Sequence, residues 1–260
     1  LLIVGLTPLN VGAAHFVVTH AGDSPDPNPG DSIGGDSSGC TLRAALDESN
    51  ALLGPDTITF SSGLARIDIL NGTLELVDSG TVIHGQSGSP TIDGLFNIYN
   101  SPLFRMNSNG HISGLTIRRS RSHGIEIIGR GNRIGGDTQA DVVIIGSTGL
   151  DYDSASGVWI HGAQATDNVV AGCYIGTTAN GGTMDPNPCG ISISTLASNN
   201  RIGSSNGSVR TLVSGNLLAG IRVTGNAANN QILNCIVGTD VTGARSLPNG
   251  LGGIVIDRGA

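Results

Sequence analysis

Apolar and polar residues alternate in short runs along most of the chain, and the runs recur at a fixed period. A segment beginning at Gly157 returns at Gly220, and a related segment beginning at Gly190 returns at Gly253, each after 63 residues. Two related units therefore alternate, and each can bury its apolar side only against its neighbours. From Asp56 to the end we predict an all-β fold, a right-handed parallel β-helix; an antiparallel sandwich is the alternative.

The repeats can be aligned because successive side chains of a strand point to opposite faces. The second and fourth positions are predicted to point into the core: Ile125, Ile127, Val158, Ile160, Ile191, Ile193, Ile221, Val223, Ile254 and Ile256. The third and fifth positions are predicted to point outward: Glu126, Trp159, Ser192, Arg222 and Val255, then Ile128, His161, Ser194, Thr224 and Asp257. A further column, Asn132, Asn168, Asn200 and Asn230, is expected to form stacked amide hydrogen bonds and to occupy left-handed turn positions.

The first part of the chain has a different pattern. Residues 1–14 are apolar and end in small residues, which indicates the remnant of a signal peptide outside the fold. In residues 15–55, a strand at 15–19 precedes a Pro- and Gly-rich loop and one amphipathic helix. The helix is expected to begin after Cys40 with Thr41 as its cap, to bury Leu42, Ala45, Leu46, Leu52 and Leu53, and to end at Gly54-Pro55. We expect it to cover the first coil, because an open strand edge recruits other chains. At the other end, the chain stops just after opening a new unit, so the β-helix of residues 56–260 is expected to be incomplete there.

These segments carry a family resemblance. The succession of strand, Asp/Pro/Gly-rich loop, CTLRAALDESNA and DTITF resembles the N-terminal CSLREA domain of exported bacterial β-helix proteins, often described as polymorphic outer-membrane-like. The later NRIGG, NVVAGCYIGT and NCIVGTDVTG resemble the repeats that follow this domain. The resemblance covers nearly the whole chain after residue 14 and implies a secreted protein or one at the bacterial surface or outer membrane. The family usually has a second Cys where Ile33-Gly34-Gly35 stands here, so Cys40 lacks its usual partner.

Composition and cysteine spacing limit the partners and the covalent links that this chain can have. The net charge is -7 with only 13 basic residues, so no basic stripe could follow a nucleic-acid backbone, and nucleic acid is excluded as a partner. No stretch is long enough to span a bilayer. Cys173 and Cys235 fall two coils apart, at roughly 9–10 Å, beyond the limit of about 7 Å for a disulfide. We expect both to be reduced and buried; the pairing of Cys189 stays open.

Candidate chemistry gathers in two places. Polysaccharide-active β-helices would need acidic and basic side chains on one face, and the densest candidates are Asp93, His111, Arg118, Arg119, His123 and Glu126. No two acidic residues are expected at matching outward positions, which argues against catalysis. The alternative is a ligand surface formed by Trp159, the only Trp, with His161 and Arg222. No cofactor is expected; Ca²⁺ is the one ion considered, with Asp137 and Asp240 as candidate ligands.

The sequence therefore predicts an exported, monomeric β-helix that acts as a non-catalytic binding or adhesion module, with a polysaccharide or a host or cell-surface glycan as its partner. The first alternative is a polysaccharide lyase or glycoside hydrolase acting on an extracellular polysaccharide. The second is a passive stalk that holds another domain away from the cell.

Overall fold

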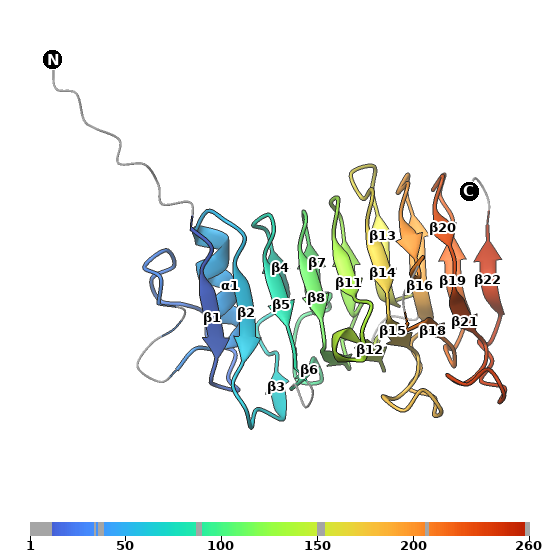
Figure 1. Cartoon of the computed structure of the whole chain (residues 1–260), viewed down its shortest axis with the longest axis horizontal. Helices are drawn as coiled ribbons and strands as arrows, with labels where there is room; N and C mark the ends of the chain where they lie inside the picture. Colours follow the sequence, from blue (N-terminus) through green and yellow to red (C-terminus); the bar gives the residue numbers. More distant parts are fainter. Residues whose placement is uncertain are drawn as a thin grey trace, which may run out of the picture.

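Three parallel sheets run the length of the molecule in a computed structural model that describes residues 12–33, 35, 39–86, 90–149, 154–205 and 208–257 (Figure 1). The first sheet consists of β1 (His15–Val18), β2 (Thr57–Phe60), β5 (Val82–His84), β8 (His111–Ser113), β11 (Arg133–Gly135), β14 (Val169–Ala171), β17 (Arg201–Ile202) and β20 (Gln231–Ile232). The second consists of β3 (Arg66–Asp68), β6 (Thr91–Asp93), β9 (Thr116–Arg118), β12 (Val143–Gly146), β15 (Cys173–Ile175), β18 (Thr211–Val213) and β21 (Cys235–Val237). The third consists of β4 (Leu74–Leu76), β7 (Phe104–Met106), β10 (Ile125–Ile127), β13 (Ser156–His161), β16 (Cys189–Ser194), β19 (Ala219–Val223) and β22 (Gly252–Ile256).

The chain visits the three sheets in turn, so that each coil adds one strand to each of them. Every strand pairing between named strands is parallel, which confirms the predicted parallel β-helix and contradicts the antiparallel sandwich. Besides the strands, the described residues contain one α-helix, α1 (Leu42–Ala51), and a short 3-10 helix at Gln139–Asp141.

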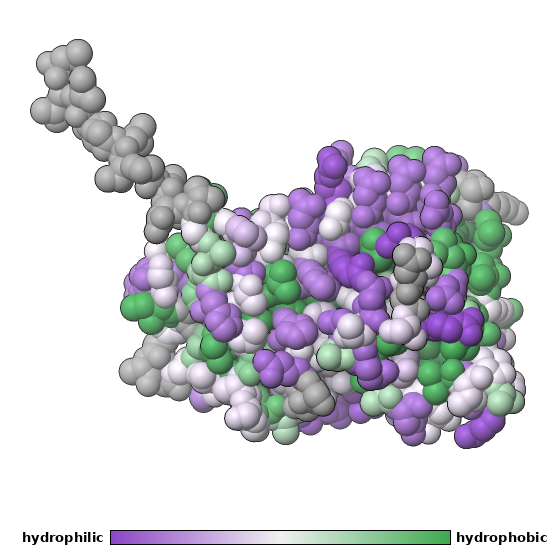
Figure 2. All heavy atoms as spheres, viewed as in Figure 1, coloured by the Kyte–Doolittle hydropathy of each residue, from purple (hydrophilic) through white to green (hydrophobic). Residues whose placement is uncertain are grey.

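The predicted inward columns form the core. In the third sheet Ile125 pairs with Val158 and Ile127 with Ile160, and all four side chains are buried. The exception is β22, where Ile254 and Ile256 keep the predicted register but are 48% and 71% exposed. They are exposed because β22 is the edge strand of its sheet within the described residues, so no further coil covers their other side. In Figure 2 apolar residues gather at this end of the molecule, whereas hydrophilic and apolar residues are mixed along the long side in view.

Helix α1 covers the opposite end, as predicted (Figure 1). The Thr41 hydroxyl accepts a hydrogen bond from the Ala44 N–H at 3.0 Å, and Leu42 and Leu46 pack into the main core. The prediction was wrong for Leu53, which is exposed, because the chain becomes extended at Leu52, where the helix ends. The fold also begins earlier than predicted: Ala14, assigned to the signal peptide, donates its backbone N–H to Asp56 Oδ1 at 2.7 Å and packs against the core. Residues 1–11 lie outside the described residues.

A ladder of buried asparagines runs along one edge of the coil, as the sequence predicted. Each side-chain amide donates to the next Oδ1 of the column: Asn132 to Asn168 at 3.0 Å, Asn168 to Asn200 at 2.9 Å and Asn200 to Asn230 at 3.0 Å. The left-handed backbone falls one position earlier than predicted, at Gly131, Asp167, Asn199 and Asn229. The ladder residue therefore follows the turn, and its amide stabilises the stacking of turns.

A second ladder, which the sequence did not reveal, stands at another corner. Asn187 donates to Asn216 and Asn216 to Asn249, both at 3.0 Å, and the Thr148 hydroxyl donates to Asn187 at 2.8 Å. These asparagines sit three or four residues before the Gly that begins the next repeat unit, at slightly different offsets. The varying offset hid the column from an alignment that starts at the glycines.

The cysteines follow the predicted register. Cys173 lies on β15 and Cys235 on β21, with β18 between them, and all four cysteines are free thiols. Burial raises the pKa of Cys173 to about 12, and Cys173 is fully enclosed. The prediction that Cys235 is buried was wrong: it is only partly buried, because β21 is the edge strand of the second sheet within the described residues.

Candidate functional site

The outer face of the third sheet carries one continuous row of side chains, here called the outer column, in which all members except the last are polar or aromatic. Strand pairing places the following residues side by side, one per coil: Glu75, Arg105, Glu126, Trp159, Ser192, Arg222 and Val255. Each lies between two inward apolar residues of its strand, so the alternation that builds the core also points these groups outward. The predicted outward positions of Glu126, Trp159, Ser192, Arg222 and Val255 are confirmed.

Glu126 is the centre of a chain of side-chain contacts across four strands. Its Oε2 accepts from Arg105 Nε at 2.5 Å and its Oε1 from His161 Nε2 at 2.9 Å, while Arg105 also contacts Glu75 at 2.9 Å. Burial by itself would raise the pKa of Glu126, but the hydrogen bonds from His161 and Arg105 outweigh it and lower that pKa. Glu126 is therefore a fixed negative charge near neutral pH.

Trp159 stacks against two histidines. The centroid of its ring lies 3.6 Å from that of His161 with an interplanar angle of 11°, and 4.4 Å from that of His123 with an angle of 21°. Its indole N–H donates to Ser194 Oγ at 3.0 Å. The Trp159 ring is thus held in one orientation by stacking and a hydrogen bond together. Its predicted position beside His161 and one coil from Glu126 is confirmed.

His123, a predicted catalytic candidate, supports this stack from below the surface. It is buried, and its Nδ1 accepts the backbone N–H of Ser156 at 3.0 Å. Burial lowers the pKa of His123 to about 4, so the ring is neutral at physiological pH. A neutral imidazole with its Nδ1 engaged serves to position Trp159 rather than to carry charge.

A diagonal rule links the outer column to the next outward column. Glu126 contacts His161, Trp159 contacts Ser194 and Arg222 contacts Asp257, and each pair is separated by 35 residues. One coil plus two residues gives this spacing, because side chains two apart on a strand share a face. Comparing each outward residue with the residue two positions further along in the next coil would have revealed these pairs from the sequence.

Arg222 lies farther along the same face. Its guanidinium donates to Asp257 Oδ2 at 3.0 Å, and the pair lines a cavity of about 250 Å³. The other lining residues are Cys189, Leu218, Ala219, Leu251 and Val255. The three predicted ligand-binding residues, Trp159, His161 and Arg222, therefore share one face, with Ser192 of β16 between the first and the last.

The other predicted catalytic residues are not part of this face. His111 lies on β8 of the first sheet, where its Nε2 hydrogen-bonds the Gly135 carbonyl at 2.8 Å. Burial lowers the pKa of His111. Asp93, Arg118 and Arg119 lie on or just after strands of the second sheet. The six residues grouped by sequence proximity thus belong to three different sheets, because each short strand turns the chain to a new side.

The second sheet contains an acidic pair that the sequence reasoning missed. Asp68 and Asp93 are register partners on β3 and β6, so the prediction that no acidic residues match at outward positions was wrong. Asp93 is buried and accepts from Arg119 Nε at 2.9 Å, with Arg66 Nε at 3.5 Å. The signal was present in RID and TID, which place Asp at the same position of consecutive coils.

A separate ion pair lies beside this acidic pair, because Arg118 of β9 is the register partner of Asp93. Asp185 pairs with Arg118 at 2.8 Å and accepts from the Ser147 hydroxyl, while Arg66 donates to Asp68 at 2.6 Å. Each of these carboxylates therefore already has an arginine partner, which is the arrangement of a stabilising network.

The two predicted calcium ligands have separate local partners. Asp137 pairs with Arg133 at 3.0 Å and accepts from Ser204 at 3.0 Å. Asp240 caps its own turn, where its Oδ1 accepts from the Thr242 hydroxyl at 2.7 Å and the Ala244 N–H at 3.1 Å. Neither residue belongs to a cluster of three or more possible metal ligands within the described residues.

Comparison of the chain with protein-family models, curated proteins and solved structures gives no match. Within the described residues, no helix has the length and apolar character needed to cross a bilayer. The fold and the site define the class: a parallel β-helix protein whose third sheet presents an ion-paired and aromatic outer face.

Proposed function

We propose that this chain is a glycan-binding module, and that the ligand lies along the outer column from Arg105 to Arg222. The observation that carries the proposal is the rigid stack of Trp159 and His161 beside the fixed charge of Glu126. The outer surface of this stack, which includes the 23% exposed His161 side chain, can contact the C–H groups of a sugar, and charged side chains next to it can hydrogen-bond the sugar hydroxyls.

The side chains at the two ends of the proposed ligand-binding stretch, Arg105 and Arg222, are accessible, as is His161 beside it. The side chains of Arg105 and Arg222 are 35% and 42% exposed, and that of His161 is 23% exposed. Neighbouring strands of a sheet lie about 4.8 Å apart, so equivalent side chains repeat at that interval along the axis. A polymer of repeating units lying along the axis would meet one new polar group at each coil. This geometry favours an extended polysaccharide over a compact ligand.

The protonation states favour binding over hydrolysis. A glycoside hydrolase needs a carboxylic acid with a raised pKa to protonate the leaving group. The pKa of Glu126 is lowered, and both its oxygens accept hydrogen bonds from Arg105 and His161. His123 is neutral and buried, so it does not supply a proton at physiological pH.

One observation keeps an enzyme as a second candidate. Asp68 and Asp93 are adjacent in register, and carboxyl groups on neighbouring strands are close enough for a pair of catalytic acids. Their engagement by Arg66 and Arg119 supports a structural role instead. A lyase or hydrolase acting on an extracellular polysaccharide at this second sheet is therefore the competing proposal.

The setting of the module is part of the proposal. The apolar residues 1–14 and the resemblance of residues 15–55 to the CSLREA domain support export to the bacterial surface or outside the cell. A monomeric adhesion module in that setting would meet host or cell-surface glycans.

A panel of acidic and neutral polysaccharides tests these proposals. Affinity electrophoresis in gels that contain each polysaccharide is expected to retard the wild-type protein in at least one gel and to retard Trp159→Ala at least tenfold less. Tyr99→Ala is the matched control, because Tyr99 is an exposed aromatic residue in the loop between β6 and β7. Release of unsaturated or reducing ends that is lost in Asp93→Asn would support the enzyme. Absence of both retardation and product release would leave the passive stalk as the function.

A further inference from the structure

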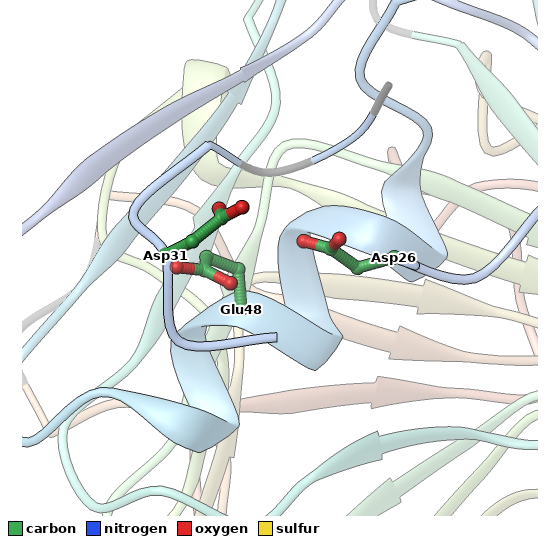
Figure 3. Close-up of side chains that lie close together, drawn as sticks. All are labelled: Asp26, Asp31 and Glu48. Atoms are coloured by element: carbon green, nitrogen blue, oxygen red, sulfur yellow. The ribbon is translucent and has the colours of Figure 1, made fainter. Parts of the chain in front are cut away.

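Three carboxylates meet where the loop after β1 crosses helix α1, and Figure 3 shows them close together. Asp26 and Asp31 come from the loop and Glu48 from the helix. Each offers one carboxylate oxygen, and these oxygens all lie within 4.8 Å of one another. Oxygen atoms at such separations can face a single ion, because Ca²⁺ binds its oxygen ligands at about 2.3–2.6 Å.

The cluster has negative charge without a matching positive charge. Glu48 is fully buried and Asp26 is only 7% exposed, yet none of the three forms an ion pair within the part of the chain that is described. Arg43 is the basic residue of α1, the helix that carries Glu48, but its guanidinium is held by Asp23 at 2.8 Å and by the Thr73 carbonyl. Buried carboxylates without a counter-ion are costly, and neutralisation by protons or by a cation relieves that cost.

An independent observation points to a cation. Asp26 is more than nine-tenths buried, and its Oδ2 has no hydrogen-bond partner among the described residues. Its Oδ1 accepts from the Asn28 N–H at 2.9 Å, and its carboxylate points toward Glu48 and Asp31 (Figure 3). A buried carboxylate oxygen without a hydrogen-bond donor is unfavourable, and a bound cation would satisfy it.

The hydrogen bonds to Glu48 orient its carboxylate but leave its oxygens able to bind a cation. The Glu48 oxygens accept the backbone N–H groups of Gly30, at 2.5 Å, and of Ser32. Each carboxylate oxygen can accept about two interactions, so these bonds orient Glu48 and leave a lone pair on each oxygen.

We propose that Asp26, Asp31 and Glu48 form a calcium site that fastens the N-terminal loop to the capping helix. The donor set consists only of oxygen, which suits Ca²⁺ rather than a transition metal. Three carboxylates supply part of the six to eight ligands that Ca²⁺ takes, and backbone carbonyls and water commonly complete the set. The ion would offset the repulsion among the three carboxylates and would link the N-terminal loop to α1 at the end of the β-helix.

Calcium titration of the whole chain tests the site. Isothermal titration calorimetry after removal of metal by chelation is expected to show one saturable site with a Kd between about 10⁻⁶ and 10⁻³ M. Saturation at about 100 times Kd is expected to raise the Tm by about 5–10 °C. Asp31→Asn, at an exposed position that should not disturb folding, is expected to weaken Kd at least about tenfold. Asp137→Asn is the control and should leave Kd unchanged.

A reversal of sign separates a metal site from an ordinary hydrogen-bonding role. In chelator, Asp26→Asn should leave the Tm unchanged or raise it, because it relieves repulsion. In millimolar CaCl₂ the same substitution should lower the Tm relative to wild type. The proposal is overturned if the wild-type protein shows neither binding heat nor a calcium-dependent Tm. It is equally overturned if Asp26→Asn and Asp31→Asn bind calcium as tightly as wild type, or if Asp137→Asn weakens binding as much as they do.

Discussion

The buried asparagine ladder supplies a measurable part of the stability of the β-helix, and Asn168→Ala tests it. The Asn168 amide donates to Gly129 O and Asn200 Oδ1, both at 2.9 Å. Its Oδ1 accepts from the Asn132 backbone N–H at 2.8 Å and from the Asn132 amide at 3.0 Å. All four capacities of a fully buried amide are therefore used. At about 0.5–1.5 kcal/mol for each hydrogen bond, Asn168→Ala should destabilise the protein by about 4 kcal/mol.

Urea unfolding followed by far-ultraviolet circular dichroism measures this loss, with the wild-type slope confirming that the same surface unfolds. Asn180→Ala is the matched control, because the Asn180 amide lies in an exposed turn and accepts only local hydrogen bonds. The control should change stability by less than about 1 kcal/mol. Equal losses in the two variants would refute the assignment of the ladder as a structural device.

Three further outcomes are expected. Ile160→Asp should destabilise the protein by more than about 4 kcal/mol and Trp159→Ala by less than half of that, in thermal or urea unfolding, because only Ile160 is fully buried; equal losses would contradict the inward and outward assignment. The pKa of His123 is about 4 in the folded protein and 6.5 in the unfolded protein, so the unfolded state binds a proton first as the pH falls. The free energy of unfolding should therefore be unaffected by His123 above pH 6.5 and should decrease as the pH falls toward 4. This loss of about 3 kcal/mol in the free energy of unfolding should be absent in His123→Asn, and the same dependence of stability on pH in both proteins would contradict the lowered pKa of His123. Cys173, with a pKa near 12, should resist iodoacetamide at about pH 8 in the native protein and react in denaturant, as mass spectrometry can follow; rapid native labelling would contradict its burial.

Much of the fold could be predicted from the sequence, because periodicity reports directly on burial. The alternation in GIEI, GVWI and GISI identified which residues of the third sheet face inward, and Thr41 identified the start of α1. The prediction failed where burial depends on neighbours. Ile254 has the same local pattern as Ile221 but lies on an edge strand of the described structure.

The candidate site was predictable only in part, because its contacts cross coils. Trp159 and Glu126 were recognised as neighbours, since both occupy the same position of the repeat. The ion pair between Glu126 and Arg105 was missed, because β7 lies in a coil with an irregular sequence spacing. The carboxylates Asp26, Asp31 and Glu48 were missed for a different reason: a loop and a helix bring them together, and no period links them.

The most direct test of the central claim uses the fluorescence of Trp159, the only Trp in the chain. The polysaccharide that retards the protein in affinity electrophoresis would be titrated while the Trp159 emission is recorded. We expect a saturable change in emission with a midpoint equal to the Kd from electrophoresis, and at least tenfold weaker binding in His161→Ala. Retention without any change in Trp159 emission, and with unaltered affinity in His161→Ala, would contradict a ligand site on the third sheet.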